Sequence, residues 1–342
     1  MVTAIRHSGS TARWCGLLAL WLASAPALAA PGLQQRLEQL LVDSGLAQPG
    51  ELRPVNIFGD DDPSNGVEDS RINMASPQWH DRDRRPWSMG GGTLHCDGRH
   101  RGSAMIVDTR EHGGLRHGLI VMSSAHVLYD LDSGRPYQAC RFHYMGLDQL
   151  PGYQAEVDLT RSRHGRFDPA GPRELPGFGR EDWAFLYVPD LPPGVAGSER
   201  LRLLPYAELP ADWAAAAHYQ FFAYSKSLGG MTVSTACSVV ESGRGDLGGG
   251  GWPGHLLDDC DSEGGASGGG LVASVGAEHY LVGIRSGAHW DGERFTASEY
   301  PLGPPDGARW DIASNTNFSR AIDRELIAVL AQMVHGLRQQ VK

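Results

Sequence analysis

The chain has 342 residues, 41% of them hydrophobic, and a formal net charge of −10 at pH 7. Such a length allows two domains, or one large domain, with a sizeable core. The acidic balance argues against nucleic acid or an anionic membrane surface as a partner.

The first 29 residues have the composition of an export signal. Arg6 and Arg13 precede an apolar run over 15–22, and Ala27-Leu28-Ala29 forms a small-x-small cleavage site. A bilayer-spanning helix needs about 20 predominantly apolar residues, so we expect no membrane anchor. We therefore expect a secreted or periplasmic protein, with cleavage near Ala29.

Residues 30–87 form an N-terminal extension whose pattern differs from the rest. Leucines at 33, 37, 40 and 41 have helical spacing, and residues 59–86 are charged and rich in turn formers. Two interpretations remain open for this extension: a cleaved propeptide and an ordered N-terminal arm.

From about Trp87 the pattern is all-β, with short β-branched or aromatic runs separated by turn formers. Strands are predicted over 103–107, 119–123, 138–144, 155–159 and 183–188, and then over 218–224, 232–240, 269–275 and 280–285. The proline-rich stretch 189–210 is predicted to connect two β-domains, over 88–195 and 196–317. An apolar stripe from Phe318 to Leu337 predicts a C-terminal helix within 318–342, with Asn317 as its cap.

Four cysteines remain after the signal peptide: Cys96, Cys140, Cys237 and Cys260. Export favours disulfides over metal ligands, and the four contain no C-x-x-C pair. We therefore expect no metal site. Four cysteines allow three connectivities, of which we expect the sequential one, Cys96 with Cys140 and Cys237 with Cys260.

The most specific motif is a glycine-rich stretch over 264–270 with Ser267 near its centre. Glycines permit a tight turn, on which a hydroxyl is exposed and backbone N–H groups converge on one point. Such a turn can stabilise a tetrahedral oxyanion as it forms. Ser267 is the candidate nucleophile, and the alternative is a plain glycine-rich hairpin.

Two other patterns precede this stretch. His126 follows an apolar strand over 121–125, where an imidazole could accept a proton from a hydroxyl. Asp182 opens the apolar strand 183–188, and a carboxylate at such a place needs a donor such as a histidine N–H. Taken singly, each pattern also has an ordinary explanation, because the chain has 14 histidines and an Asp often caps a turn.

In order and approximate spacing, the segments 124–126, 182–186 and 265–269 resemble the three active-site motifs of the trypsin/chymotrypsin-like serine peptidases. Exported bacterial trypsin-like and glutamyl endopeptidase-like members are the most similar branches. The resemblance extends over residues 88–335. It implies two six-stranded antiparallel β-barrels with the active site in the cleft between them, and a C-terminal α-helix.

The resemblance also implies roles. Ser267 would be the nucleophile, His126 the general base and Asp182 the residue that orients this base, while the N–H groups of Gly265 and Ser267 would form the oxyanion hole. The implied activity is hydrolysis of peptide bonds in a protein or peptide by a monomer without a cofactor. Ala266 occupies the position of an Asp that pairs with the freed N-terminus in animal digestive members, so that activation switch is absent.

Residues that could select the substrate give conflicting signals. Asp261 lies where trypsin-like enzymes have an Asp that selects basic side chains, whereas Arg285 aligns with a His that helps glutamyl endopeptidases bind acidic ones. Ser286 and Gly287 follow Arg285 on the strand that would border the pocket. We expect an acidic P1 residue, bound by Arg285. The alternative is that Asp261 and Arg285 pair with each other.

Two other classes of function compete with this one. The Gly265-x-Ser267-x-Gly269 pattern also fits the nucleophile elbow of an α/β-hydrolase esterase, although that fold requires alternating strands and helices. A catalytically inactive two-barrel binding protein is the other alternative. A metallopeptidase is disfavoured because the sequence contains no H-E-x-x-H motif.

Overall fold

The computed structural model describes residues 56–59, 69–76, 79, 90–144, 153–169, 180–190, 200–210, 218–241, 254–291, 294, 304–305 and 307–340. The chain divides into two units, Met1–Glu51 and Leu52–Lys342, and every described residue belongs to the second. The expected export signal and the helix expected near Leu33 lie outside the described residues and stay predictions. No helix in these ranges is long and apolar enough to cross a membrane.

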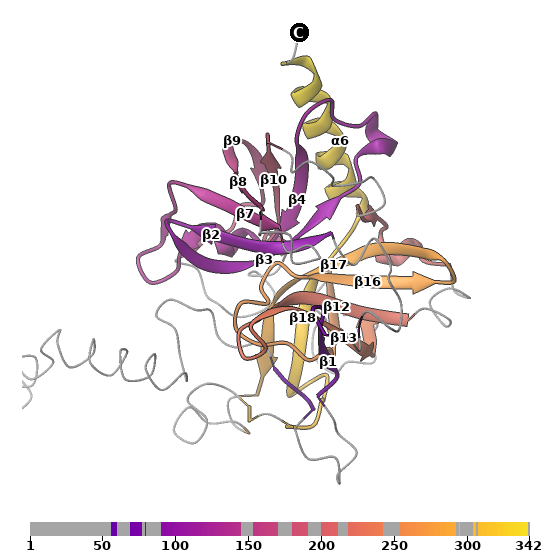
Figure 1. Cartoon of the computed structure of the whole chain (residues 1–342). Helices are drawn as coiled ribbons and strands as arrows, with labels where there is room; N and C mark the ends of the chain where they lie inside the picture. Colours follow the sequence, from indigo (N-terminus) through magenta and orange to yellow (C-terminus); the bar gives the residue numbers. More distant parts are fainter. Residues whose placement is uncertain are drawn as a thin grey trace, which may run out of the picture. The chain divides into compact units, whose positions relative to one another are not determined.

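Seven antiparallel strands form the first sheet, in the order β8-β7-β2-β3-β4-β10-β9 (Figure 1). Their bounds are β2 Gly91–Cys96, β3 Arg99–Val107, β4 Leu119–Ser123, β7 Cys140–Tyr144, β8 Tyr153–Glu156, β9 Asp158–His164 and β10 Ala184–Val188. The short pair β5 (Tyr129–Asp130) and β6 (Arg135–Pro136) and the 3₁₀ turns η3 (Arg110–His112) and η4 (Ala125–Leu128) lie in its connections. One face of this sheet encloses its own apolar core, which includes Leu94, Val121 and Phe142.

The second sheet has nine strands among the described residues, eight of them in the order β1-β13-β12-β16-β17-β18-β15-β14. The bounds are β1 Arg71–Asn73, β11 Arg202–Leu203, β12 His218–Ser225, β13 Gly230–Cys237, β14 Val239–Glu241, β15 His255–Asp258, β16 Gly270–Val275, β17 Glu278–Trp290 and β18 Asn315–Ala321. The ninth strand, β11, pairs in parallel with β17 and is followed by the 3₁₀ turn η6 (Tyr206–Glu208).

A shared apolar core joins the two sheets. Met105 and Phe185 of the first sheet belong to the same buried cluster as Phe222 and Ile284 of the second. Leu330 of the C-terminal helix α6 (Arg324–Gln339) is also in this cluster and is fully buried. Because the core is continuous, the two sheets and α6 pack as one body within the second unit.

The C-terminal helix begins later than the apolar stripe predicts. Asp323 is its N-cap, with its Oδ1 accepting a hydrogen bond from Leu326 N at 2.9 Å. The expected start at Phe318 and the expected cap Asn317 are therefore wrong. Both residues belong to strand β18, which pairs with β15 and β17 and is buried along its whole length. Strand β18 has the sequence NTNFSRA, in which most residues are polar although all are buried, so no apolar pattern marks it as a strand and Phe318 was counted with the helical stripe.

The predicted all-β class with a C-terminal helix is confirmed: two curled antiparallel sheets are present (Figure 1). The six strands expected in each half are replaced by seven in the first sheet and nine in the second, counted over the described residues. Such antiparallel sheets do not fit the α/β-hydrolase alternative, which needs helices alternating with parallel strands. Both disulfides join the expected partners, Cys96 with Cys140 and Cys237 with Cys260.

Part of the N-terminal extension belongs to the second sheet. Strand β1 pairs with β13, from Arg71 opposite Ser234 to Asn73 opposite Thr232. Farther upstream, Asn56 N donates to Asn317 Oδ1 at 2.7 Å, and Asn317 Nδ2 donates to Asn56 O at 2.9 Å. The described residues of the extension therefore pack on the second sheet, and we call them the N-terminal arm (56–59 and 69–76); whether the extension is cleaved as a propeptide stays open.

Candidate active site

His126 and Asp182 lie at the ends of neighbouring strands. His126 is in η4, just after β4, and Asp182 lies two residues before β10, which pairs with β4 through Ala184 opposite Ser123. The carboxylate contacts the histidine at two points: Oδ2 is 2.7 Å from the ring Nδ1, and Oδ1 accepts the backbone N–H at 2.8 Å. Both side chains are buried. An ionised Asp182 therefore fixes the ring and favours a proton on Nδ1, which makes Nε2 the basic ring nitrogen.

Ser267 lies on a turn in which two positions require glycine. Gly265 and Gly268 have φ angles of 96° and 79°. A Cβ on Gly268 would also lie 2.1 Å from Ser123 Oγ, so no side chain fits there. Among the described residues, the N–H groups of Gly265 and Ser267 have no protein acceptor. Both donors are therefore left available on the turn, and free N–H groups are what an oxyanion hole needs.

Serines of the first sheet hold this turn against the segment that carries His126. Ser103 donates from its N to Ser267 O at 2.7 Å and from its Oγ to Gly265 O at 2.9 Å. The carbonyl oxygen of Arg285 accepts two hydrogen bonds, from Ser124 Oγ at 2.5 Å and from Gly268 N at 2.9 Å. These hydrogen bonds tie the Ser267 turn to β3 and, through the carbonyl of Arg285, to Ser124, two positions before His126.

The charge of Arg285 is not available to a substrate, because it is paired with a buried carboxylate. The side chain is fully buried, and its Nη1 and Nη2 donate to the two carboxylate oxygens of Asp258 at 2.8 and 2.7 Å. Its guanidinium also lies 4.3 Å from the centre of the Phe221 ring. The prediction that Arg285 binds a substrate carboxylate is wrong, because Asp258 already takes both terminal nitrogens. Asp258 itself was missed, since an Asp in a buried strand has no recognisable motif.

Asp261 also has another role than the predicted one. Its Oδ1 accepts the backbone N–H groups of Phe58 and Gly59 at 2.7 and 3.0 Å, and its Oδ2 accepts that of Ser70 at 2.7 Å. The carboxylate is buried and anchors the N-terminal arm, so neither substrate selection nor pairing with Arg285 describes it. Ser286 and Gly287 follow Arg285 on β17, with Ser286 buried and Gly287 half-buried, and their role at a pocket stays a prediction.

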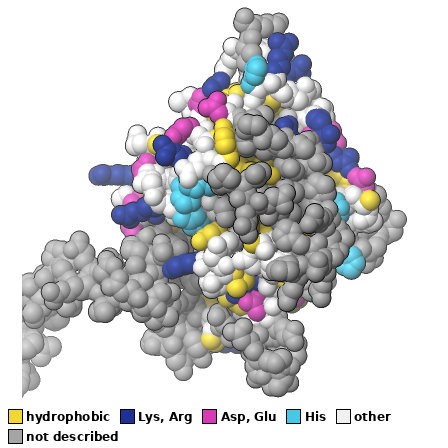
Figure 2. Space-filling view, viewed as in Figure 1, with side chains coloured by type: hydrophobic (Ala, Val, Ile, Leu, Met, Phe, Trp, Pro, Cys, Tyr) yellow, Lys and Arg dark blue, Asp and Glu magenta, His cyan; other side chains and the backbone are white. Residues whose placement is uncertain are grey.

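Three histidines of the first sheet form a cluster next to the Ser267 turn, and sequence reasoning missed them. His95 on β2 stacks on His143 of β7 with ring centroids 3.8 Å apart, and His100 of β3 lies 5.4 Å from His95. His100 touches the turn itself, since a Cβ on Gly265 would be 2.7 Å from its Cε1. Figure 2 shows histidine side chains (cyan) gathered over this region of the first sheet.

Burial decides the protonation of this cluster. Desolvation, reinforced by the neighbouring His95, lowers the pKa of His100 to about 4. The pKa of His143 falls to about 4 for the same two reasons. The cluster is therefore neutral near pH 7. No group of three or more His, Cys, Asp or Glu side chains within the described ranges is arranged to hold a metal ion.

Because Asp258 and Arg285 form a buried pair, substitutions of the two residues should have strongly coupled effects on stability. We expect Asp258→Leu and Arg285→Met each to lower the free energy of unfolding by about 3 to 5 kcal/mol, because each leaves a buried partner without its hydrogen bonds. The double variant Asp258→Leu/Arg285→Met should lose much less than the sum of the two. Urea denaturation of the four proteins measures this, and additive losses would contradict the pairing.

The histidine cluster predicts a dependence of stability on pH. A pKa of about 4 for His100 in the folded chain, against about 6.5 when unfolded, means that the unfolded chain binds protons more readily between these values. The free energy of unfolding should therefore fall as the pH drops from about 6.5 to about 4, and fall less in His100→Gln. Denaturation across this range tests it, with the exposed His218→Gln as control; identical slopes for His100→Gln and the parent chain would contradict it.

Comparisons with known proteins give distant likenesses of fold to solved structures. No family model matches the chain, and no curated protein matches it. Among solved structures, a similar one is the protease Anisep from Arthrobacter nicotinovorans, with 12% sequence identity and a TM-score of 0.45. The alignment covers 72% of this chain and 96% of that one.

Proposed function

We propose that this protein is a serine endopeptidase that hydrolyses peptide bonds through an acyl-enzyme on Ser267. The observation that carries the proposal is the two-point clamp of Asp182 on His126, at 2.7 and 2.8 Å. A carboxylate that merely capped a turn would accept the backbone N–H alone, whereas here it also fixes the ring. Ser267 and its two glycines are tied to the same region through Ser103 and the carbonyl of Arg285.

The mechanism follows from this arrangement. The Ser267 hydroxyl attacks the substrate carbonyl carbon and passes its proton to Nε2 of His126. Asp182 stabilises the imidazolium that forms, and the N–H groups of Gly265 and Ser267 donate to the oxyanion. Collapse of this intermediate releases the amine, which takes the proton from His126. A water molecule then attacks the acyl-enzyme by the same route and frees Ser267.

The expected setting of this activity belongs to the same proposal. An exported, disulfide-containing chain acts outside the cytoplasm, on a protein or peptide substrate. The two disulfides support this location, while the export signal itself lies outside the described residues. The inactive two-barrel binding protein is the alternative that a direct test of Ser267 must exclude.

Labelling with a fluorophosphonate tests the nucleophile. The parent protein should be modified at one serine, identified as Ser267 by mass spectrometry, and Ser267→Ala should not react. His126→Ala and Asp182→Asn should cut the turnover of a peptide substrate by roughly 10³-fold or more, because the base is lost or held in the wrong tautomer. An unreactive parent protein, or equal labelling of Ser267→Ala, would reject the mechanism in favour of the binding protein.

The substrate preference follows from the corrected roles of two residues. Arg285 is neutralised by Asp258, and both oxygens of Asp261 are bound by the N-terminal arm, so neither charge is available to a substrate. We therefore expect an uncharged residue at P1 in place of an acidic one. A peptide library that varies P1 measures this. Preferential cleavage after Glu and Asp, or after Lys and Arg, would contradict the expected uncharged P1 residue and would show an acidic or a basic preference, respectively.

A further inference from the structure

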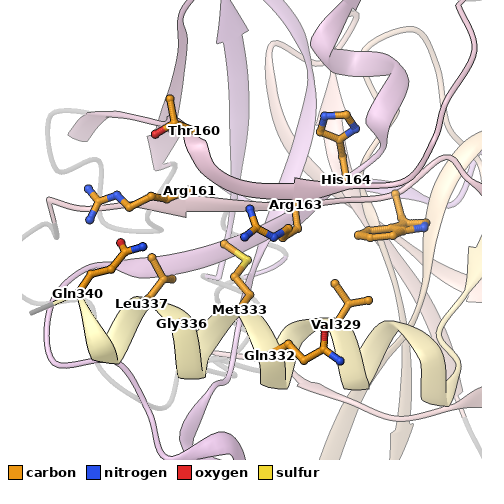
Figure 3. A pocket seen from close by; sticks show the side chains of 11 residues that line it. Thr160, Arg161, Arg163, His164, Val329, Gln332, Met333, Gly336, Leu337 and Gln340 are labelled. Carbon is orange, nitrogen blue, oxygen red and sulfur yellow. The ribbon is translucent and has the colours of Figure 1, made fainter.

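A pocket of about 360 Å³ lies between strand β9 and helix α6 (Figure 3). None of His126, Asp182 and Ser267 lines it. We propose that it is a second binding site, for an acidic peptide segment in which a carboxylate neighbours an apolar side chain. Its use as an auxiliary site for recognising protein substrates rests on the proposed peptidase activity, whereas the binding itself does not.

The floor of the pocket is apolar. Helix α6 contributes Val329, Met333 and Leu337, and the last two are almost fully buried. The ring of Trp183 contributes from the first sheet. Gly336 lies in the same stretch of helix, and a Cβ built on it would meet no atom within 4 Å. The missing side chain therefore leaves room for an apolar group of a ligand.

The rim of the pocket is positive. Arg161 is neutralised, because its Nε is 2.6 Å from Asp158 Oδ2 and its guanidinium lies 4.6 Å from the centre of the Tyr187 ring. Arg163 differs: its Nη1 donates to Ser162 O at 2.9 Å, and within the described part of the chain it has no carboxylate partner. Figure 3 shows both arginines on the strand side of the pocket. Arg163 therefore carries the charge that a ligand could neutralise.

Both properties together select the class of ligand. A guanidinium binds a carboxylate through two parallel hydrogen bonds, and the described lining contains no acidic residue that would repel it. A sulfated polysaccharide would satisfy the arginine but would have no apolar group for the floor. A peptide that places an acidic residue next to a large apolar one satisfies both.

Fluorescence anisotropy on the full chain carrying Ser267→Ala tests binding without cleavage. The probe is a dye-labelled, amidated peptide, Gly-Asp-Phe-Glu-Gly, compared with Gly-Asn-Phe-Gln-Gly and Gly-Asp-Ala-Glu-Gly. We expect the first peptide to bind at least ~10-fold more tightly than the other two, since each lacks one of the two interactions.

Variants of the pocket locate the binding. Arg163→Gln should weaken it by ~10-fold or more through loss of the charged hydrogen bonds. Gly336→Leu should do the same by filling the space over the helix, while Gly336→Ala should bind nearly as the parent. Both replacements favour the helix, so unfolding does not explain a loss. The control for charge is Arg135→Gln, an exposed arginine outside the pocket lining.

Several outcomes would overturn the site. These are equal affinity in Arg163→Gln, equal affinity for the neutral peptide, or binding of a sulfated polysaccharide but not of the peptide. For the auxiliary role, Arg163→Gln should lower kcat/KM on casein and leave that on a short peptide substrate unchanged. If the peptide binds but the parent protein is not labelled by a fluorophosphonate, the second binding site is supported and the proposed peptidase activity is rejected. The failure of one proposal can therefore be told from the failure of the other.

Discussion

The buried ion pair between Asp258 and Arg285 is the interaction on which the candidate site depends. Burying two charges is costly, and the cost is offset here by two parallel hydrogen bonds and a ring beneath the guanidinium. The side chain of Arg285 thereby fixes a stretch of β17. The carbonyl oxygen of the same residue receives Ser124 Oγ and Gly268 N, one from each sheet. The buried residue Arg285 thus links the segments that carry His126 and Ser267.

Asp261 is a second buried carboxylate, and backbone N–H groups stabilise it. Three backbone N–H groups of the N-terminal arm surround it, and hydrogen bonds to a charged acceptor are stronger than neutral ones. The arm in turn extends the second sheet through β1. Because Asp261 lies only six positions before Ser267, the arm is connected to the Ser267 turn through a short piece of chain. The extension is in this way a structural part of the candidate site.

Much of the fold was predictable because its strands are short, apolar and bounded by turn formers. Strand β4 has the predicted bounds, and the glycines around Ser267 mark a turn that needs positive φ angles. Strand β18 was not predictable, because most of its buried residues are polar and it shows neither an apolar run nor an alternation. The sequence suggests that Arg285 and Asp261 bind a substrate, because it shows the two charged side chains but not the groups that they contact. Asp258 and the backbone donors of the arm become visible only in three dimensions.

The core shared by the two sheets has a consequence for how this molecule can move. Met105 and Phe222 belong to one packed cluster although they come from different sheets, and α6 adds Leu330 to it. Packed interiors resist deformation, so opening a hinge between the halves would expose this cluster to water. The two halves should therefore melt in a single transition and be unable to fold as separate fragments. Movement among the described residues is then confined to the connections between strands, with the halves themselves fixed.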